Sequence, residues 1–498
     1  MTIQETTVLV PSSSSSSSLR WNWKGLALVI MTPMLGGFLY GFDIGATSFV
    51  LSKLILHKIS ALQQGMLVSA VSLGALLGSH LVFLSHSIGR RMELRVSATL
   101  YLVGNLCNVL SGTWWDSLIM LFVGRFIFGI GVGFTMHGAP AYMAEMCPPE
   151  IRGAVVSAKE TVIVAGIVIG YATGNSLPSS EWTDLYALST MVALPMLLLT
   201  FCIPRSKRWL LLHGYRDEAK ESMRFIYTGE EIEKEFSKLE VQLNLDRTPS
   251  SSFSLGEWNL DDYRPALVAS MGLIVFQQFS GQPSVLSYTT ILFQAAGWSG
   301  NASVITSLFM MGASMTTVAL VDRVGRKRLL YACCAIMMTA SFTLSICFWN
   351  ETLSTTSKGI VLVAMFIYIG GYQVGFGPIT WCIVSEVFPL EVRGKAIALG
   401  VELNYALNFS VQLLFPLLRE SLGFGRSFAL FGFGLGLCIL FVHDKVPETK
   451  GLTLEEIQVL LSTKQSPHKS HSFTRQDNPR ETIDEESSLL PPALELSA

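Results

Sequence analysis

Ionisable side chains stand inside long apolar stretches of this 498-residue chain. Asp43 lies in the stretch 24–48, and Arg125 lies in the stretch 117–142. A charge at the centre of a bilayer costs about 2.5 to 3.5 kcal/mol on insertion scales, so such residues face water, a ligand or a partner. A buried pair would satisfy both groups, and protonation of the aspartate would break it, which makes the pair a candidate proton switch. A static ion pair that only holds two helices together is the alternative.

Two more carboxylates stand in apolar stretches, Glu160 beside Lys159 and Glu402 farther along the chain. Glu160 is a second candidate proton carrier, or else it forms a local pair with its neighbour. Asp43 is therefore the leading candidate for proton coupling and not the only one.

Amide side chains cluster on two later stretches, with aromatic residues near them. The amides are Gln277, Gln278, Gln282, Asn404 and Asn408, and the aromatic residues are Tyr372, Trp381 and Tyr405. Amides both donate and accept hydrogen bonds, as sugar hydroxyls require, and aromatic faces cover the C–H surface of a sugar. The cluster favours a polyol site, although each amide alone is equally explained by hydrogen bonding between helices.

The composition of the chain indicates which structural elements hold these residues in position. Half of the chain is hydrophobic and 14% is charged, whereas a soluble domain carries about 25% charged residues. A helix needs about 20 apolar residues to cross a bilayer. Such segments recur near 24–48, 64–84, 92–112, 117–142, 155–177, 184–203, 265–295, 301–321, 329–350, 358–387, 394–421 and 426–443. The sequence predicts an all-α membrane protein with twelve transmembrane helices in two halves of six.

Polar segments divide these spans into five regions. The regions are an N-terminal tail 1–23, a six-helix half 24–203, a linker 204–264 with short surface helices, a second six-helix half 265–443, and a C-terminal tail 444–498. Lys and Arg gather in the loops after even-numbered spans, so these loops, the linker and both tails are expected in the cytoplasm.

The two halves carry an internal repeat. Glu145, Pro148, Arg152 and Gly153 recur with the same spacing as Glu386, Pro389, Arg393 and Gly394. Halves duplicated in this way place a substrate site between them near the middle of the membrane and alternate its access by rocking.

Several functions are disfavoured by the sequence. A net charge of −2 provides no large basic face for nucleic acid, and the eight cysteines lack metal-binding spacing. No nucleophile, base and metal-ligand constellation appears, so we expect neither enzymatic activity nor a metal or cofactor, with protons as the only coupling ion.

The ordered motifs of the chain resemble the sugar porter branch of the major facilitator superfamily over nearly all of residues 24–460. They are Gly89-Arg90-Arg91, Gly124-Arg125, Glu145 with Arg152-Gly153, Gln277-Gln278, Asp322-Arg323-Val324-Gly325-Arg326-Lys327, Gly377-Pro378 with Trp381, Glu386 with Arg393-Gly394, and Pro447-Glu448-Thr449-Lys450-Gly451. Phe276-Gln277-Gln278 and Met136-His137-Gly138-Ala139-Pro140 are most similar to plant vacuolar glucose transporters and their plastid relatives.

This resemblance implies hexose or pentose binding by the amide and aromatic cluster, with Asp43 where proton-coupled members keep an aspartate. It implies that cytoplasmic salt bridges close the outward-facing state, through Gly89, Arg90, Arg91, Glu145, Arg152, Asp322, Arg323, Arg326, Glu386 and Arg393. A facilitative sugar uniporter and a non-transporting sugar sensor remain alternatives to a proton-coupled transporter.

The chain also departs from the family pattern. The usual Pro-Glu-Ser-Pro-Arg reads Pro204-Arg205-Ser206-Lys207-Arg208, and His86 replaces an aspartate of the first cytoplasmic loop. Glu160 and Pro283 stand where many members have a sugar-binding glutamine and asparagine. These changes leave the identity of the sugar open.

The C-terminal tail contains Glu485 followed by Leu489 and Leu490, the form of an acidic dileucine sorting signal. Such a signal would engage sorting adaptors and favours a vacuolar or endolysosomal membrane. The plasma membrane and the plastid envelope are the alternatives.

Overall fold

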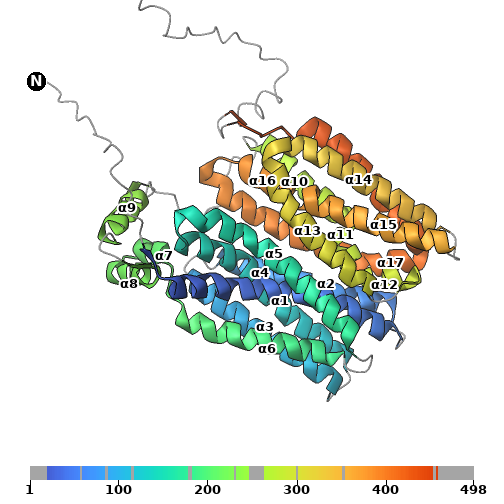
Figure 1. Ribbon diagram of the computed structural model, residues 1–498, viewed down its shortest axis with the longest axis horizontal. Helices are drawn as coiled ribbons and strands as arrows, with labels where there is room; N and C mark the ends of the chain where they lie inside the picture. The colour runs from blue at the N-terminus through green and yellow to red at the C-terminus, as the bar shows by residue number, and fades with distance from the viewer. Residues whose placement is uncertain are drawn as a thin grey trace, which may run out of the picture.

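The computed structural model describes most of the chain apart from its two ends and several loops. The described residues are 20–56, 59–84, 88–113, 117–177, 182–228, 232–245, 263–298, 301–349, 354–452 and 456–457. They form two helical bundles that lie side by side, an N-terminal one coloured blue to green and a C-terminal one coloured yellow to red (Figure 1).

The N-terminal bundle consists of six long helices. They are α1 (Trp23–Leu56), α2 (Ala61–Leu84), α3 (Arg90–Thr113), α4 (Leu118–Met146), α5 (Pro149–Ser176) and α6 (Thr183–Cys202). Local signals mark two of the starts. Ser117 caps α4 by accepting a hydrogen bond from the backbone N–H of Met120. Pro149 opens α5 at a position where no N–H is needed.

Helices α1 and α5 approach each other at small residues. A Cβ on Gly41 or Gly45 would collide with the backbone of α5, and a Cβ on Gly166 or Gly170 would collide with that of α1. Glycines at this spacing let membrane helices pack at close range. Asp43 stands between the two glycines of α1, so this crossing holds the aspartate in place.

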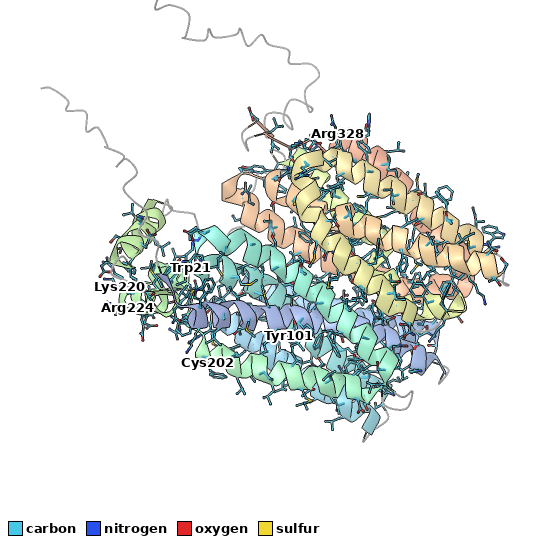
Figure 2. The ribbon with its side chains drawn as sticks, in the orientation of Figure 1. Trp21, Tyr101, Cys202, Lys220, Arg224 and Arg328 are labelled. Atoms are coloured by element: carbon cyan, nitrogen blue, oxygen red, sulfur yellow. The ribbon has the colours of Figure 1, made fainter. Side chains whose placement is uncertain are left out.

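The linker packs against one end of the N-terminal bundle. It contains α7 (Lys207–Leu212), α8 (Arg216–Ile226), β2 (Tyr227–Thr228) and α9 (Ile232–Leu245), and β2 pairs antiparallel with β1 (Arg20–Trp21). Figure 2 shows Trp21, Lys220 and Arg224 together at this end, with Cys202 at the near end of α6. The start of the chain is thereby tied to the linker.

Lys207 of α7 is buried beneath the linker. Its Nζ donates to the carbonyl oxygen of Met146 at 3.4 Å. Burial, with the nearby charge of Arg152, lowers the pKa of Lys207 to about 8.

The helices of the C-terminal bundle are interrupted more often. They are α10 (Arg264–Phe279), α11 (Gln282–Ser287), α12 (Thr289–Ala295), α13 (Asn301–Val324), α14 (Arg326–Cys347), α15 (Thr355–Gly371), the π-helical turn η2 (Tyr372–Phe376), α16 (Gly377–Glu386) and α17 (Leu390–Lys445). Gly281, with φ of 86°, separates α10 from α11, and Gly423, with φ of 77°, kinks α17. Both glycines adopt left-handed backbone that other residues rarely tolerate.

Eight helical segments of the described residues are long and apolar enough to cross a membrane. Four further spans complete the twelve. The third span is α3, whose hydropathy is lowered by charged residues in its first turns. The seventh span is divided among α10, α11 and α12, and the eighth is α13. Helix α17 contains the last two spans, which meet at its kink. The predicted all-α fold of two six-helix halves is confirmed. The bounds 24–48 were too short, because α1 continues to Leu56.

Candidate functional site

A cavity of about 460 Å³ lies between the two bundles. Its walls come from α1, α2, α4 and α5 of one half and from α10, α11, η2, α16 and α17 of the other. The structure brings all of the predicted substrate and proton residues to it. They are Gln277, Gln278, Gln282, Tyr372, Trp381, Asn404, Tyr405, Asn408, Asp43, Arg125 and Glu160. The volume falls within the usual range for small-molecule sites, about 300 to 1,000 Å³.

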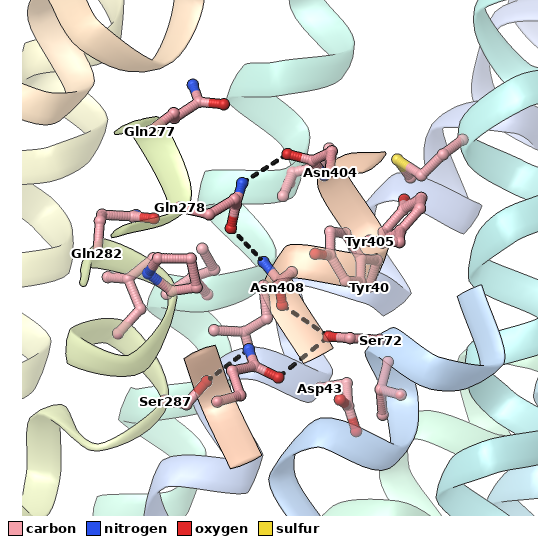
Figure 3. Close-up of a pocket in the computed structure, with 18 of the residues that line it drawn as sticks. Tyr40, Asp43, Ser72, Gln277, Gln278, Gln282, Ser287, Asn404, Tyr405 and Asn408 are labelled. Carbon is pink, nitrogen blue, oxygen red and sulfur yellow. Dashed lines mark hydrogen bonds between the residues drawn. The ribbon is translucent and has the colours of Figure 1, made fainter. Parts of the chain in front are cut away.

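The amides of α10 and α17 bond to one another on the wall of the cavity (Figure 3). Gln278 donates to Asn404 Oδ1 at 2.5 Å, and Asn408 Nδ2 donates to Gln278 Oε1 at 3.1 Å. Gln277 instead donates to the backbone carbonyl of Gly377 at 3.0 Å, at the bend of the tenth span. Gln277 therefore also serves the helix-to-helix role that was the alternative for each amide.

Ser72 of α2 extends this network into the N-terminal half. Its hydroxyl lies 2.7 Å from Asn408 Oδ1 and 3.0 Å from Gln412 Oε1, and Gln412 reaches Ser287 at 3.5 Å. One hydroxyl proton can serve only one of the two acceptors at a time. The sequence reasoning missed Ser72, Gln412 and Ser287. The four-residue spacing of Asn404, Asn408 and Gln412 on one helix face would have revealed Gln412.

Aromatic side chains cover other parts of the wall. Tyr372 belongs to η2, Trp381 to α16 and Tyr405 to α17. Tyr40 of α1, which was not predicted, also lines the cavity and packs against the cluster that contains Tyr405. Rings from both halves thus surround the amides.

Asp43 and Arg125 form a buried ion pair with side-chain exposures of 5% and 3%. Two Arg125 nitrogens lie 3.2 and 3.4 Å from the two carboxylate oxygens. Arg125 also donates to Leu67 O at 2.6 Å, Thr47 Oγ1 at 2.7 Å and the Tyr186 hydroxyl at 3.1 Å. The guanidinium therefore has three neutral acceptors besides the aspartate, and sequence spacing revealed none of them.

The side chain of Glu160 is much more exposed than that of Asp43. Its side chain is 66% exposed, and its carboxylate lies 3.3 Å from Lys159 Nζ. The structure therefore contains the local pair that was one of the two readings of Glu160. Glu402, the third intramembrane carboxylate, lies 2.9 Å from His80 Nδ1 of α2.

Apart from the bonds of Ser72 beside the cavity, several hydrogen bonds that join the two halves lie at the ends of the spans opposite to the linker. They link Ser48 to Thr290 at 3.0 Å, Tyr171 to Leu286 O at 2.6 Å, Asn175 to Asn301 at 2.6 Å and Arg419 to Gln64 at 2.9 Å. Among the described residues, the cross-half hydrogen bond or ion pair nearest to the linker end is the His80–Glu402 pair. These contacts close the cavity on the far side, so that it faces the linker side.

The predicted gating residues on the linker side pair within each half. Arg90 lies 3.4 Å from Glu145, and Arg326 lies 3.0 Å from Glu386, so the internal repeat extends to the contacts. Glu93, which was not predicted, lies 2.7 Å from Arg90. It supplies a carboxylate to the basic motif whose usual aspartate is replaced by His86.

Other gating residues make different contacts. Arg393 donates to the backbone carbonyl of Phe388, and in the described part of the chain neither it nor Arg152 makes an ion pair. Arg91 donates to Ile203 O at 3.2 Å, Gly89 packs against a tryptophan ring, and the carbonyl of Arg323 accepts from Lys450. The Asp322 side chain and the sorting residues Glu485, Leu489 and Leu490 lie outside the described residues.

Comparisons with known proteins agree with this architecture. Residues 29–461 match the family described as sugar (and other) transporter. The chain is 38% identical to an Arabidopsis thaliana protein named D-xylose-proton symporter-like 3, chloroplastic, over 90% of this chain and 84% of that protein. It is 30% identical to the D-xylose transporter of Levilactobacillus brevis, over 86% of this chain and 94% of that one.

Solved structures show the same fold. The inward-open conformation of the xylose transporter XylE from E. coli superposes with a TM-score of 0.74 at 25% identity, covering 87% of this chain and 99% of that one. XylE bound to 6-bromo-6-deoxy-D-glucose, described as a proton:xylose symporter, superposes with a TM-score of 0.68 at 26% identity, covering 88% of this chain and 100% of that one. The chain therefore belongs to the sugar transporter family of the major facilitator superfamily.

Proposed function

We propose that this protein carries a hexose or a pentose across a membrane by alternating access and couples that movement to protons. The observation that carries the proposal is one cavity between the two halves that contains both an amide and aromatic cluster and a buried Asp43–Arg125 pair. Relatives named for xylose, for glucose and for proton symport support it.

Sugar recognition is assigned to the amides between α10 and α17. Sugar hydroxyls would exchange with the bonds that Gln278 now makes to Asn404 and Asn408. Such an exchange gains little per bond, about 0.5 to 1.5 kcal/mol, because bonds are both lost and formed. Recognition therefore depends on several amides acting together and on the rings of Tyr372, Trp381 and Tyr405.

Proton coupling is assigned first to Asp43. When its carboxylate is protonated, Arg125 keeps its three neutral acceptors, so the guanidinium stays in place while the aspartate is released. Protonation therefore frees α1, which carries Asp43, while Arg125 stays bound in place on α4. Glu160 is the second candidate, because its carboxylate is exposed and lines the cavity. Protons are the coupling ion, and no other cofactor is part of the proposal.

The gating motifs are assigned to the cytoplasmic closure of the outward-facing state. In this structure, whose cavity faces the linker side, Arg90–Glu145 and Arg326–Glu386 stay within their own halves. Closure would bring the two sets together, and Arg152 and Arg393 would then gain carboxylate partners.

Sugar-driven proton flux in proteoliposomes tests the coupling. At 100 mV, one proton carried per sugar is worth about 2.3 kcal/mol, roughly a fortyfold sugar gradient. Wild-type protein should accumulate sugar against its gradient, and Asp43→Asn should only equilibrate it. Equal accumulation by both proteins would remove the assignment to Asp43, and equilibration by wild type would leave a facilitative uniporter.

A sensor without transport is the remaining alternative. Uptake of radiolabelled xylose or glucose by purified protein in liposomes separates it from a transporter, since a sensor would bind sugar without moving it. The relatives found are transporters, and we include no enzymatic activity in the proposal.

The membrane of residence is proposed from the tail. The dileucine pattern at Glu485, Leu489 and Leu490 supports a vacuolar or endolysosomal membrane reached through sorting adaptors. One relative is named chloroplastic, which keeps the plastid envelope as an alternative beside the plasma membrane. Imaging of a tagged Leu489→Ala/Leu490→Ala variant tests this, because loss of the signal should move the protein to the plasma membrane and leave a plastid protein unmoved.

A further inference from the structure

A second cavity of about 480 Å³ lies at the linker end of the N-terminal half, away from the central site. Its walls come from the start of α3, the end of α6, the segment that follows α6, and α8. Phe201, in the last turn of α6, is 60% exposed on the outer surface of the bundle. The cleft therefore lies at the linker-side ends of the spans.

Three guanidinium groups gather at this cleft. Arg91 and Arg205 line it, and Arg95 stacks over the ring of Phe201 at 4.1 Å. Arg91 and Arg95 each donate one N–H to a carbonyl at the end of α6, at 3.2 and 3.3 Å. Glu218, 3.4 Å from Arg205, and Glu221 are the carboxylates that line it. The two arginines and two glutamates of the wall balance, and Arg95 beside it adds one further positive charge.

Several N–H groups here have no acceptor in the structure. Among the described residues, the buried Nε of Arg91, the buried Nε of Arg95 and the buried Nε1 of Trp209 are without a hydrogen-bond partner. Arg205 stacks above the same indole at 5.9 Å. A buried donor without an acceptor costs about 1 to 3 kcal/mol. One of these donors belongs to a residue that lines the cleft, and the other two belong to residues that contact the lining residues Phe201 and Arg205, so together they indicate that an acceptor is missing.

The internal repeat shows what occupies the corresponding place in the other half. There Pro447-Glu448-Thr449 follows the last span, and Glu448 accepts the backbone N–H groups of Arg326 and Lys327 at 3.0 and 3.2 Å. Thr449 bonds to Glu386 just as Ser206 bonds to Glu145, which fixes the correspondence. The residue that corresponds to Glu448 is Arg205. The N-terminal half has therefore exchanged a carboxylate for a cation at this position.

We propose that this cleft binds the phosphate of an anionic lipid headgroup in the cytoplasmic leaflet. Phosphate oxygens accept from several arginines at once, and Arg is the side chain best suited to such forked contacts. Basic pockets at the cytoplasmic ends of membrane helices are suited to such headgroups. A free phosphate would have the same chemistry, but the exposed Phe201 provides a surface for an acyl chain that only a lipid has. The proposal does not depend on the sugar or on the proton.

Binding of short-chain fluorescent phosphatidylinositol phosphate to the purified full-length protein in detergent tests the proposal. Phosphatidylcholine carrying the same fluorophore is the reference lipid, and inorganic phosphate is the soluble competitor. We expect the anionic lipid to bind at least about tenfold more tightly than the reference, since several charge-assisted hydrogen bonds form. Equal binding of the two lipids would overturn the proposal, and inorganic phosphate that displaces the lipid at an equal concentration would overturn the lipid assignment.

Substitutions in opposite directions separate binding from folding. Arg205→Gln should weaken binding of the anionic lipid about tenfold, and Glu221→Gln, which removes a repelling carboxylate from the wall, should strengthen it. Arg264→Gln, at the exposed cytoplasmic start of α10, is the matched control and should leave binding unchanged. A decrease for Glu221→Gln, or an equal loss for Arg264→Gln, would contradict the site. Melting temperatures of all three variants show whether each is folded.

Discussion

The Asp43–Arg125 pair predicts an unusual order of stabilities among its variants. Breaking a buried ion pair by removing one partner costs about 3 to 5 kcal/mol, because a buried charge is left without compensation. Asp43→Leu should show this full cost, since it removes both acceptor oxygens at 3.2 and 3.4 Å. Asp43→Asn keeps one acceptor oxygen and should cost less, about 1 to 3 kcal/mol.

Variants that lose one neutral acceptor of Arg125 serve as controls for the loss of stability. Thr47→Val and Tyr186→Phe each remove one neutral hydrogen bond to the guanidinium, at 2.7 and 3.1 Å. Each should cost about 1 to 3 kcal/mol, the usual loss for a hydrogen bond to a charged group. The double variant Asp43→Leu/Arg125→Leu should be more stable than Asp43→Leu alone, because it leaves no unpaired charge.

Equilibrium unfolding of the purified protein in mixed micelles, followed by tryptophan fluorescence, gives the free energies of unfolding. Asp43→Leu should be the least stable of the five variants. If it is no less stable than Asp43→Asn, or if the double variant is the least stable, then the aspartate is not the main compensation for Arg125. Such a result would also weaken its assignment as the proton switch, because its charge would matter little to its surroundings.

Three further predictions concern other parts of the molecule. Gln278→Leu removes both amide bonds to α17 and should weaken sugar binding about tenfold or more, as measured by isothermal titration calorimetry. Proton movement through the variant in response to the membrane potential should be retained. Gly45→Val should prevent folding, seen as loss of a monodisperse peak in size-exclusion chromatography, because its Cβ meets the backbone of α5. The pKa of Lys207 lies near 8, below its unfolded value, so the folded state binds fewer protons and the melting temperature should rise from pH 7 to pH 9. Lys207→Met should abolish that rise.

The sequence predicted the membrane fold because the signals for a span are local. About 20 apolar residues are enough to cross a bilayer, wherever the rest of the chain lies. It was less accurate where the spans are interrupted. The predicted span 265–295 is divided among α10, α11 and α12, and α1 continues past its predicted end to Leu56. Helix ends depend on neighbouring helices as well as on hydropathy.

The sequence alone identified most of the ionisable and amide residues that meet in the central cavity. Asp43, Arg125 and the amides are expensive or unusual in apolar segments, so their presence there is itself a signal. Their meeting in one cavity followed from the internal repeat, which places a site between the halves.

Only the tertiary structure decided how these residues are partnered. Ser72 bonds to Asn408 from 336 positions away, and Arg125 reaches Leu67 O across 58 positions. Serine and a backbone carbonyl are common everywhere, so neither shows in a sequence as a partner. The same holds for the direction in which the cavity opens and for the arginine cleft beside α8. Both depend on which surfaces meet across the bundle, and helix packing sets this through side chains far apart in the chain.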